Sequence, residues 1–269
     1  MALRFGLALM NDFAPHISPS SRIGQMREQV RAARDAGMHS IWVLNHYLGN
    51  MATMQPLVTL AALAEHAGEM KLGTNMFILP LRHPVAVAEE FATLDHITGG
   101  NVIAGFGMGY RGNEYAAFGI PMEQRVARYE ESVELIRRLW RAEPVTFEGE
   151  HFTVRGERIG IPPVQPGGPR IWVGAGVHKT GARRAARLGD TWIIPRTPRW
   201  RSWCRTCACT ARSANASAAA PPTRSWYAAS WSSTTTRNAP ARSAWRRARP
   251  APACTPASRR PTTPTRTGT

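Results

Sequence analysis

Cysteine is missing from most of this 269-residue chain, and acidic residues are missing from its last part. The first 198 residues contain no cysteine, because all four lie later in the chain, at Cys204, Cys207, Cys209 and Cys254. A cysteine-free body gives no disulfide framework and is typical of a cytoplasmic protein. No apolar run reaches the roughly 18 residues of a membrane span, and the apolar start of the chain is too short for a secretory signal. We therefore expect a soluble, cytoplasmic protein.

Positive charge is unevenly distributed along the chain. The formal net charge is +16, which by itself suggests a polyanionic partner such as nucleic acid. Residues 1–198 hold 21 Lys and Arg against 18 Asp and Glu, whereas residues 199–269 hold 13 Arg and no acidic residue. The basicity therefore belongs to the tail and not to the body of the chain.

Short apolar runs alternate with helical patterns in residues 1–195, which is typical of β/α units around a parallel sheet. Strands are expected at residues 3–9, 40–44, 71–79, 101–107, 170–174 and 191–194. Helices are expected from a cap at Ser20 or Ser21 to Gly37, at residues 57–67, from Pro84 onward, at 123–141 and at 180–188. Residues 145–154 (VTFEGEHFTV) predict an additional β-hairpin that turns at residues 148–150. Six strands in this order predict an α/β fold, either a (β/α)8 TIM barrel or an open doubly wound sheet.

Three long motifs resemble those of one family. They are LGTNMFILPLRHPVAVAEEFATLDHITGG (residues 72–100), GFGMGYRGNEYAAFGIP (105–121) and PRIWVGAGVHKTGARRAARLGDTW (169–192). In this order they resemble the bacterial-luciferase-like family of flavin-dependent monooxygenases and deazaflavin-dependent oxidoreductases. The resemblance covers about residues 3–195 and implies a TIM barrel with the cofactor lying across the carboxyl ends of the strands, where barrel chemistry is built.

The resemblance implies two kinds of activity. With reduced FMN and O₂, the protein would be a monooxygenase acting on a small organic substrate. A separate flavin reductase and a second copy of the chain in a homodimer are then the expected partners. With the deazaflavin coenzyme F420, it would instead transfer a hydride. The substrate itself is not readable from the sequence.

Two residues are the candidate catalytic groups. His46 follows the second strand, where the family often places an acidic residue and a histidine beside the flavin. An imidazole titrates near neutrality, so His46 can donate a hydrogen bond or a proton there. The alternative is a structural histidine satisfied by a backbone carbonyl. Tyr110 stands where some deazaflavin-dependent sugar-phosphate dehydrogenases have a catalytic glutamate, so their acid–base chemistry does not carry over.

Further residues at the strand ends are the candidate cofactor-binding groups. They are Asn45, Asn75, Ile78, Gly107, Met108, Asn113, Ala175, Gly176, Val177 and His178. The amide of Asn75 can hydrogen-bond ring heteroatoms, and glycines such as Gly107 allow backbone to approach a planar ring. Residues 175–178 precede a helix whose first N–H groups and dipole suit a phosphate. The family commonly has a serine there, and His178 or Lys179 can replace its hydroxyl.

Structural roles are expected for several other residues in the same motifs. Residues 82–84 (RHP) are expected to form a turn into the next helix, which Pro84 opens. Glu114 is expected to pair with an arginine such as Arg125. We expect no metal site in the body of the chain.

The tail, residues 196–269, has no Leu, Ile, Val, Met, Phe, Lys, Asp, Glu, Gln or His. It cannot supply a hydrophobic core and is predicted to be a disordered low-complexity region, separate from an incomplete barrel at residues 1–195. An arginine-rich nucleic-acid arm with stacking tryptophans is one alternative, which the absence of lysine weakens. A zinc site at Cys204, Cys207 and Cys209 is disfavoured because no second cysteine pair or histidine is nearby.

The genetic code offers an explanation for the unusual amino-acid composition of the tail. Residues 195–269 number 75, and 72 of them have codons with G or C in the middle position. The exceptions are Asn215, Tyr227 and Asn238. A GC-rich gene has G or C at nearly every third codon position, and a shifted reading frame moves that base to the middle. We therefore interpret the tail as a frameshifted translation that replaces the seventh and eighth β/α units. We expect the chain as written not to bind flavin stoichiometrically.

Overall fold

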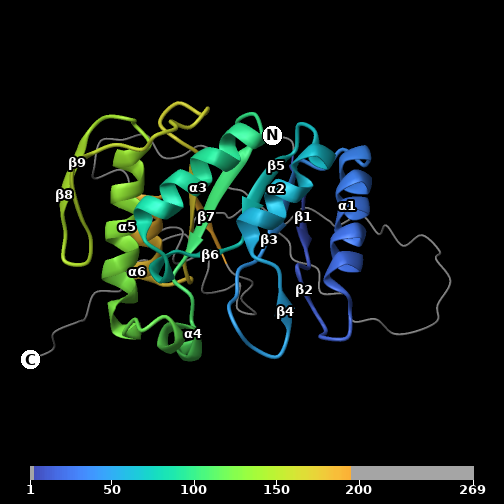
Figure 1. Ribbon diagram of the computed structural model, residues 1–269, viewed down its shortest axis with the longest axis horizontal. Coiled ribbons are helices and arrows are strands. Elements are labelled where there is room, and N and C mark those ends of the chain that lie inside the picture. Colours follow the sequence, from blue (N-terminus) through green and yellow to red (C-terminus); the bar gives the residue numbers. More distant parts are fainter. Residues whose placement is uncertain (1–2, 195–269) are drawn as a thin grey trace, which may run out of the picture. The chain divides into compact units, whose positions relative to one another are not determined.

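The computed structural model describes residues 3–194, and Figure 1 shows their helices and strands. The strands are β1 (Gly6–Leu9), β2 (Asp12–Phe13), β3 (Ser40–Val43), β4 (Ala52–Thr53), β5 (Lys71–Thr74), β6 (Phe77–Ile78), β7 (Val102–Gly107), β8 (Val145–Glu148), β9 (Thr153–Glu157), β10 (Arg170–Gly174) and β11 (Thr191–Ile193). The α-helices are α1 (Pro19–Asp35), α2 (Pro56–Ala67), α3 (Pro84–Ile97), α4 (Gly112–Ala117), α5 (Arg125–Leu139) and α6 (Lys179–Leu188). Short 3₁₀ turns cover Leu79–Leu81 and Met122–Gln124. None of the described helices is long and apolar enough to cross a membrane.

One parallel sheet organises the described residues. Its strand order is β1-β3-β5-β7-β10-β11, with β6 pairing on β7. Each new β/α unit therefore adds its strand on the same side of the previous one, as in a barrel. A doubly wound sheet would reverse direction at a switch point, so that alternative is wrong. The six core strands expected from the sequence are confirmed.

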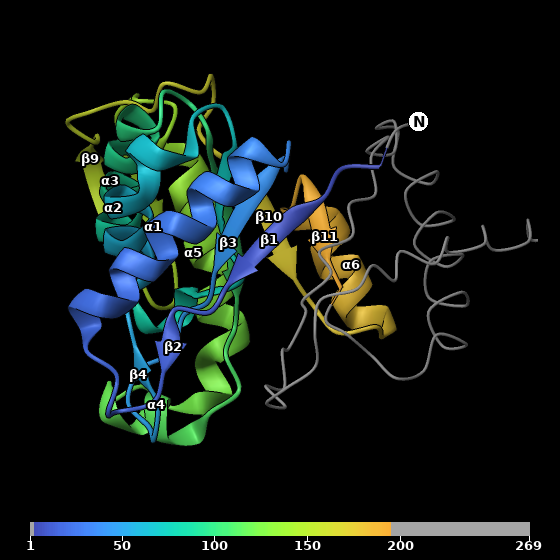
Figure 2. The same ribbon diagram turned by 90° about the vertical axis from the view of Figure 1, so that its right-hand side faces the viewer.

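The two faces of this sheet are packed differently. Helices α1, α2, α3 and α5 lie along one face (Figure 2), over buried aliphatic and aromatic strand residues that include Ile41, Val43, Phe106 and Val173. The opposite face carries Trp42 and Trp172, whose ring centroids are 4.8 Å apart. Successive side chains of a strand point to opposite faces of the sheet, so each strand contributes residues to both faces.

Several boundaries differ from the expected ones. The expected strand at residues 71–79 is two strands, because β5 ends at Thr74 and the chain passes through a cis peptide at Asn75-Met76 before β6 pairs with β7. The cap expected at Ser20 or Ser21 is wrong: Pro19 takes the start of α1 and Ser18 is its N-cap, without a side-chain hydrogen bond. Proline at this position needs no N–H partner.

The hairpin is present, and two other small elements were not expected. Strands β8 and β9 pair antiparallel, and Phe147, Phe152 and Val154 bury their side chains in the main core. The unexpected elements are the short antiparallel pair β2-β4 and the helix α4. The proposed tail domain, residues 196–269, lies outside the described residues.

Candidate functional site

The carboxyl ends of the parallel strands bring the candidate residues to one edge of the sheet. Asn45 and His46 follow β3, Met108 to Tyr110 follow β7, and residues 175–178 follow β10. The β2-β4 pair and α4 lie beyond this same edge in both ribbon views (Figures 1 and 2). The edge is therefore where the chain gathers its polar loops, as expected for chemistry on a barrel.

A histidine–carboxylate pair lies at this edge. His46 Nδ1 is 3.0 Å from Glu114 Oε1, and the same oxygen accepts a hydrogen bond from the backbone N–H of Tyr47 at 2.9 Å. Glu114 is fully buried, whereas the His46 side chain is 20% exposed. The carboxylate therefore fixes the orientation of the imidazole and leaves its Nε2 edge free for a molecule outside.

Glu114 pairs with an arginine, as expected, but with Arg111 and not with the suggested Arg125. Arg125 Nη1 donates instead to the carbonyl of Met122 at 3.0 Å. The arginine nearest to Glu114 is Arg111, whose Nη1 is 3.9 Å from Oε1. The cause is the position of α4, which turns Glu114 inward toward the end of β3.

Tyr110 is close to His46 but mostly exposed. Its ring meets the imidazole edge-on, with centroids 5.7 Å apart and an interplanar angle of 86°. The Tyr110 side chain is 70% exposed, and the Arg111 guanidinium lies 5.8 Å from its ring centroid. The structure thus brings together the two residues that the sequence singled out as catalytic candidates.

Buried asparagines hold the strand ends in place. Asn45 Oδ1 accepts from the N–H of Ile78 at 3.1 Å, and its Nδ2 donates to Gln55 Oε1 at 3.1 Å. Asn11, which sequence reasoning missed, donates to the carbonyls of Leu44 and Met54 and accepts from the N–H of Leu44. Both amides are at most 2% exposed, so they position backbone, and the Asn45 side chain is not available to a ligand.

The glycines at this edge make room for neighbouring parts of the chain, mainly Thr74 and Met76. A Cβ at Gly105 would lie 1.8 Å from the carbonyl oxygen of Thr74, and one at Gly174 would lie 1.4 Å from Sδ of Met76. At Gly107 it would lie 3.0 Å from Cβ of Met76. The space expected beside Gly107 for a planar ring is therefore taken by Met76, which follows Asn75 between β5 and β6.

The loop after β10, residues 175–178, has unused hydrogen-bond donors. His178 is the N-cap of α6, and its Nδ1 accepts from the N–H of Gly181 at 3.0 Å. Among the described residues, the N–H groups of Gly176, Val177, Lys179 and Thr180 make no hydrogen bond. Free N–H groups at a helix start are suited to a phosphate. His178 caps α6 through Nδ1, which leaves its Nε2 atom as the ring's donor.

The remaining predicted residues differ in accessibility. Ile78 and Ala175 are buried, Met108 is half-buried, and Asn113 is exposed on α4. The Met108 carbonyl accepts from the hydroxyl of Tyr115, whose pKa burial raises to about 12. That phenol is therefore a fixed donor and not a proton acceptor near neutral pH.

The turn at residues 82–84 has the structural role expected of it. His83 is the N-cap of α3 and accepts from the N–H of Val85 at 3.3 Å. Arg82 makes an ion pair with Glu90. Burial, with a smaller contribution from Arg128, lowers the pKa of His83, so the neutral, capping form is favoured.

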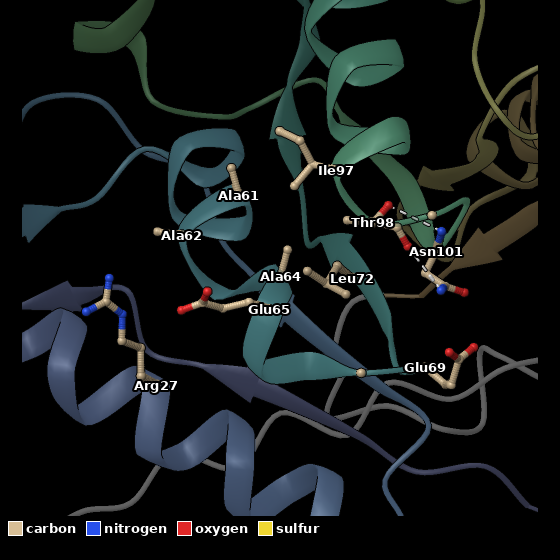
Figure 3. A pocket seen from close by; sticks show the side chains of 12 residues that line it. Arg27, Ala61, Ala62, Ala64, Glu65, Glu69, Leu72, Ile97, Thr98 and Asn101 are labelled. Atoms are coloured by element: carbon tan, nitrogen blue, oxygen red, sulfur yellow. Dashed lines mark hydrogen bonds between the residues drawn. The ribbon is translucent and has the colours of Figure 1, made fainter.

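A separate hollow of about 690 Å³ lies at the opposite end of the strands (Figure 3). It is lined by Arg27 of α1, by α2 residues such as Ala61 and Glu65, and by Thr98 and Asn101, which precede β7. Barrel enzymes place their chemistry at the carboxyl ends, so this hollow is not the candidate site.

The chain matches part of the length of its curated relatives. An F420-dependent glucose-6-phosphate dehydrogenase of Amycolatopsis mediterranei is 34% identical over 170 residues, which is 60% of this chain and 50% of that protein. A 5,10-methylenetetrahydromethanopterin reductase of Archaeoglobus fulgidus is 30% identical over 185 residues, or 68% of this chain and 52% of that protein. The chain thus spans about half the length of the curated relatives it matches.

Solved structures share the fold. A monooxygenase from Streptomyces bottropensis matches with a TM-score of 0.76 and 27% identity, covering 81% of this chain and 68% of that one. The FMN-bound oxygenating constituent of 3,6-diketocamphane monooxygenase from Pseudomonas putida matches with a TM-score of 0.72 and 20% identity, covering 82% and 64%.

The family model described as luciferase-like monooxygenase matches residues 3–252. This match extends past residue 195, where the sequence resemblance was expected to end. Together with the parallel order of six strands and the polar loops at their carboxyl ends, it identifies the chain as a member of the luciferase-like monooxygenase family.

Proposed function

We propose that the protein is a flavin-dependent monooxygenase that acts on a small organic substrate with reduced FMN and O₂. The observation that carries the proposal is the placement, at one end of a parallel sheet, of the His46–Glu114 pair and the unused N–H groups around residues 175–178. The first can position a proton and the second can bind an anion.

The donor set around α6 fits the phosphate of FMN. Four backbone N–H groups are unused there, and the helix dipole adds to their attraction for an anion. The deazaflavin coenzyme F420 also carries a phosphate, so this end of the site accepts either cofactor. Reduced FMN would supply the electrons for oxygenation, whereas reduced F420 would supply a hydride.

His46 would donate or accept a proton at its Nε2 atom. Because Nδ1 faces the carboxylate of Glu114, the neutral ring carries its proton on Nδ1 and its lone pair on Nε2. Once protonated, the ring can return that proton from Nε2 to a substrate oxygen. The Tyr110 ring lies beside the imidazole in an edge-on contact.

Hydride transfer with F420 is the second candidate function. It is favoured by the curated relatives, since an F420-dependent dehydrogenase is 34% identical to this chain. Tyr110 supplies a phenol and no carboxylate, so a substrate whose oxidation needs an acidic residue at that position is disfavoured.

We also propose that residues 196–269 are translated in a shifted frame. The test is the nucleotide sequence of codons 195–200: a one-base correction should restore apolar strand patterns and acidic residues downstream. The chain translated from that corrected gene is called the frame-corrected chain below. If no correction restores such a pattern, the frame is sound, and the alternative of an arginine-rich arm is tested by salt-dependent nucleic-acid binding.

Turnover distinguishes the two functions. The frame-corrected chain is supplied with FMN and a separate flavin reductase, and substrate-dependent O₂ incorporation is measured. In parallel, reduced F420 is offered with carbonyl substrates, and its reoxidation is followed by absorbance. Oxygen incorporation supports the monooxygenase, and anaerobic F420 turnover without it supports the second candidate. A His46→Gln variant should lose most of either activity while retaining cofactor binding.

A further inference from the structure

Three potential metal ligands meet where the turn of the β8-β9 hairpin contacts α5. They are Glu131 of α5, and Glu150 and His151 of the turn. One ligand atom from each residue lies within 4.8 Å of the other two. None of the three belongs to the candidate functional site.

The local backbone holds Glu131 in this place. Its Oε1 accepts from the N–H of Glu150 and its Oε2 from the N–H of His151, each at 3.0 Å. Gly149 makes room for it, because a Cβ there would lie 2.3 Å from Glu131 Oε2. A carboxylate can accept about four hydrogen bonds or ligand contacts, so each oxygen keeps a lone pair that can bind a cation.

His151 provides the independent observation. Its side chain is only 7% exposed, and its Nε2 atom is buried without a hydrogen-bond partner among the described residues. Leaving a buried polar atom unpaired is costly, and such atoms in native proteins usually have a partner. Nε2 lies 4.0 Å from Glu150 Oε1, too far for a hydrogen bond and suited to a shared ion between the two atoms.

We propose that Glu131, Glu150 and His151 bind a divalent transition-metal ion, with Zn²⁺ as the ion of choice. Zinc takes imidazole nitrogen and carboxylate oxygen at about 2.0–2.2 Å, which separates ligand atoms by roughly 3.4 Å in a tetrahedron. The exposed side chain of Glu150 can close the remaining gap, and water completes the fourth position. The ion fastens the hairpin turn to α5.

Neighbouring cations do not fill the site. The Arg128 guanidinium lies 4.8 Å from the Phe152 ring centroid and donates from Nε to the carbonyl of Pro80. Arg155 lies 3.6 Å from Glu148, on the hairpin strands. Arg128 interacts electrostatically with Glu131 but makes its hydrogen bond elsewhere. Two carboxylates and one imidazole form a donor set that favours a divalent cation.

The test is a Zn²⁺ titration of the untagged full chain by calorimetry, with the four cysteines replaced by serine to remove competing thiolates. We expect one ion per chain and a higher thermal unfolding midpoint with zinc than with a chelator. His151→Gln should weaken zinc binding at least about tenfold, and Glu150→Gln should weaken it by about the same factor.

Matched controls separate binding from folding. Glu148→Gln, in the same hairpin, and His16→Gln, an exposed histidine, should leave zinc affinity unchanged. Glu150 is exposed, so its substitution does not disturb the core, and the circular dichroism of Glu150→Gln should match that of the parent. Absence of saturable binding, or binding that survives both His151→Gln and Glu150→Gln, would overturn the proposal.

Discussion

The loops after β3 and β10 lie at the same end of one sheet and use their polar groups in opposite ways. After β3, Asn45 and His46 are hydrogen-bonded to partners from distant parts of the chain, including Ile78 and Glu114. After β10, the N–H groups of Gly176, Val177, Lys179 and Thr180 have no partner among the described residues. We propose that the first loop supports proton chemistry and that the second binds an external anion. Four predictions test this difference, in decreasing order of expected effect.

Removing the charge beside His46 should have the largest effect. Glu114→Gln keeps an acceptor for the N–H of Tyr47 but no longer stabilises a protonated imidazole. We expect turnover of the frame-corrected chain to fall about 100-fold, with cofactor affinity nearly unchanged. Steady-state kinetics measures both, and Glu123→Gln, an exposed glutamate, is the control. An equal loss in both variants would show that Glu114 has no specific role.

Breaking the scaffold after β3 should destabilise the fold. Asn45→Ala leaves the buried N–H of Ile78 without its acceptor, at a cost of about 2 kcal/mol in the free energy of unfolding. Denaturant unfolding measures this loss, with the exposed Asn50→Ala as control. A loss below about 0.5 kcal/mol, the usual range for a surface substitution, would contradict the positioning role.

The unused donors after β10 can be removed one at a time. Lys179 is the first residue of α6, a position that tolerates proline, and His178 before it is already extended. Lys179→Pro removes one N–H, and Lys179→Ala removes the charge but keeps that N–H. We expect the proline variant to bind FMN or F420 about tenfold more weakly than the alanine variant, at equal thermal stability. Equal affinity of the two variants would exclude this N–H as a phosphate donor.

The ion pairs that attach α6 to α5 should have the smallest effect. Burial alone raises the pKa of Glu130, but hydrogen bonds from Arg184 and Arg187 outweigh it and lower that pKa. Its contribution to stability is therefore present above the unfolded pKa and is lost as the pH falls through the lower, folded value. Glu130→Gln should cost about 1 kcal/mol at pH 7, and this cost should shrink as the pH falls through the lowered pKa of Glu130.

The control for this pair is Glu134→Gln, whose partner Arg138 is exposed. That substitution should change stability by less than about 0.5 kcal/mol at either pH. Thermal unfolding of both variants at pH 7 and pH 3 provides the measurement. A cost for Glu130→Gln that is independent of pH would contradict the electrostatic explanation.

The regular elements were predictable because they depend on local patterns. Apolar spacing and Pro84 predicted α3, in which Val87, Phe91 and Leu94 are buried. The same patterns could not predict the break after Thr74, because residues 71–79 contain no proline and the residues after Asn75 are all apolar. Helix α4 is only six residues long, with the sequence GNEYAA, and is too short to show a clear helical period.

The candidate site was predictable in its members but not in its contacts. His46 and Tyr110 were singled out by their positions after strands, and the structure places their rings 5.7 Å apart. Glu114 is 68 residues from His46, and no local signal pairs them. Their pairing could have been suspected only from the rule that parallel strands end at one edge. Asn11 was missed because an asparagine after a first strand resembles an ordinary turn residue.

Equilibrium titration of FMN and F420 tests the central claim most directly. The chain as written and the frame-corrected chain are titrated side by side, and bound cofactor is measured by fluorescence. We expect the frame-corrected chain to bind one of the two cofactors at one per chain and the chain as written not to reach stoichiometric binding. Saturable stoichiometric binding by the chain as written, or no binding of either cofactor by the frame-corrected chain, would contradict it.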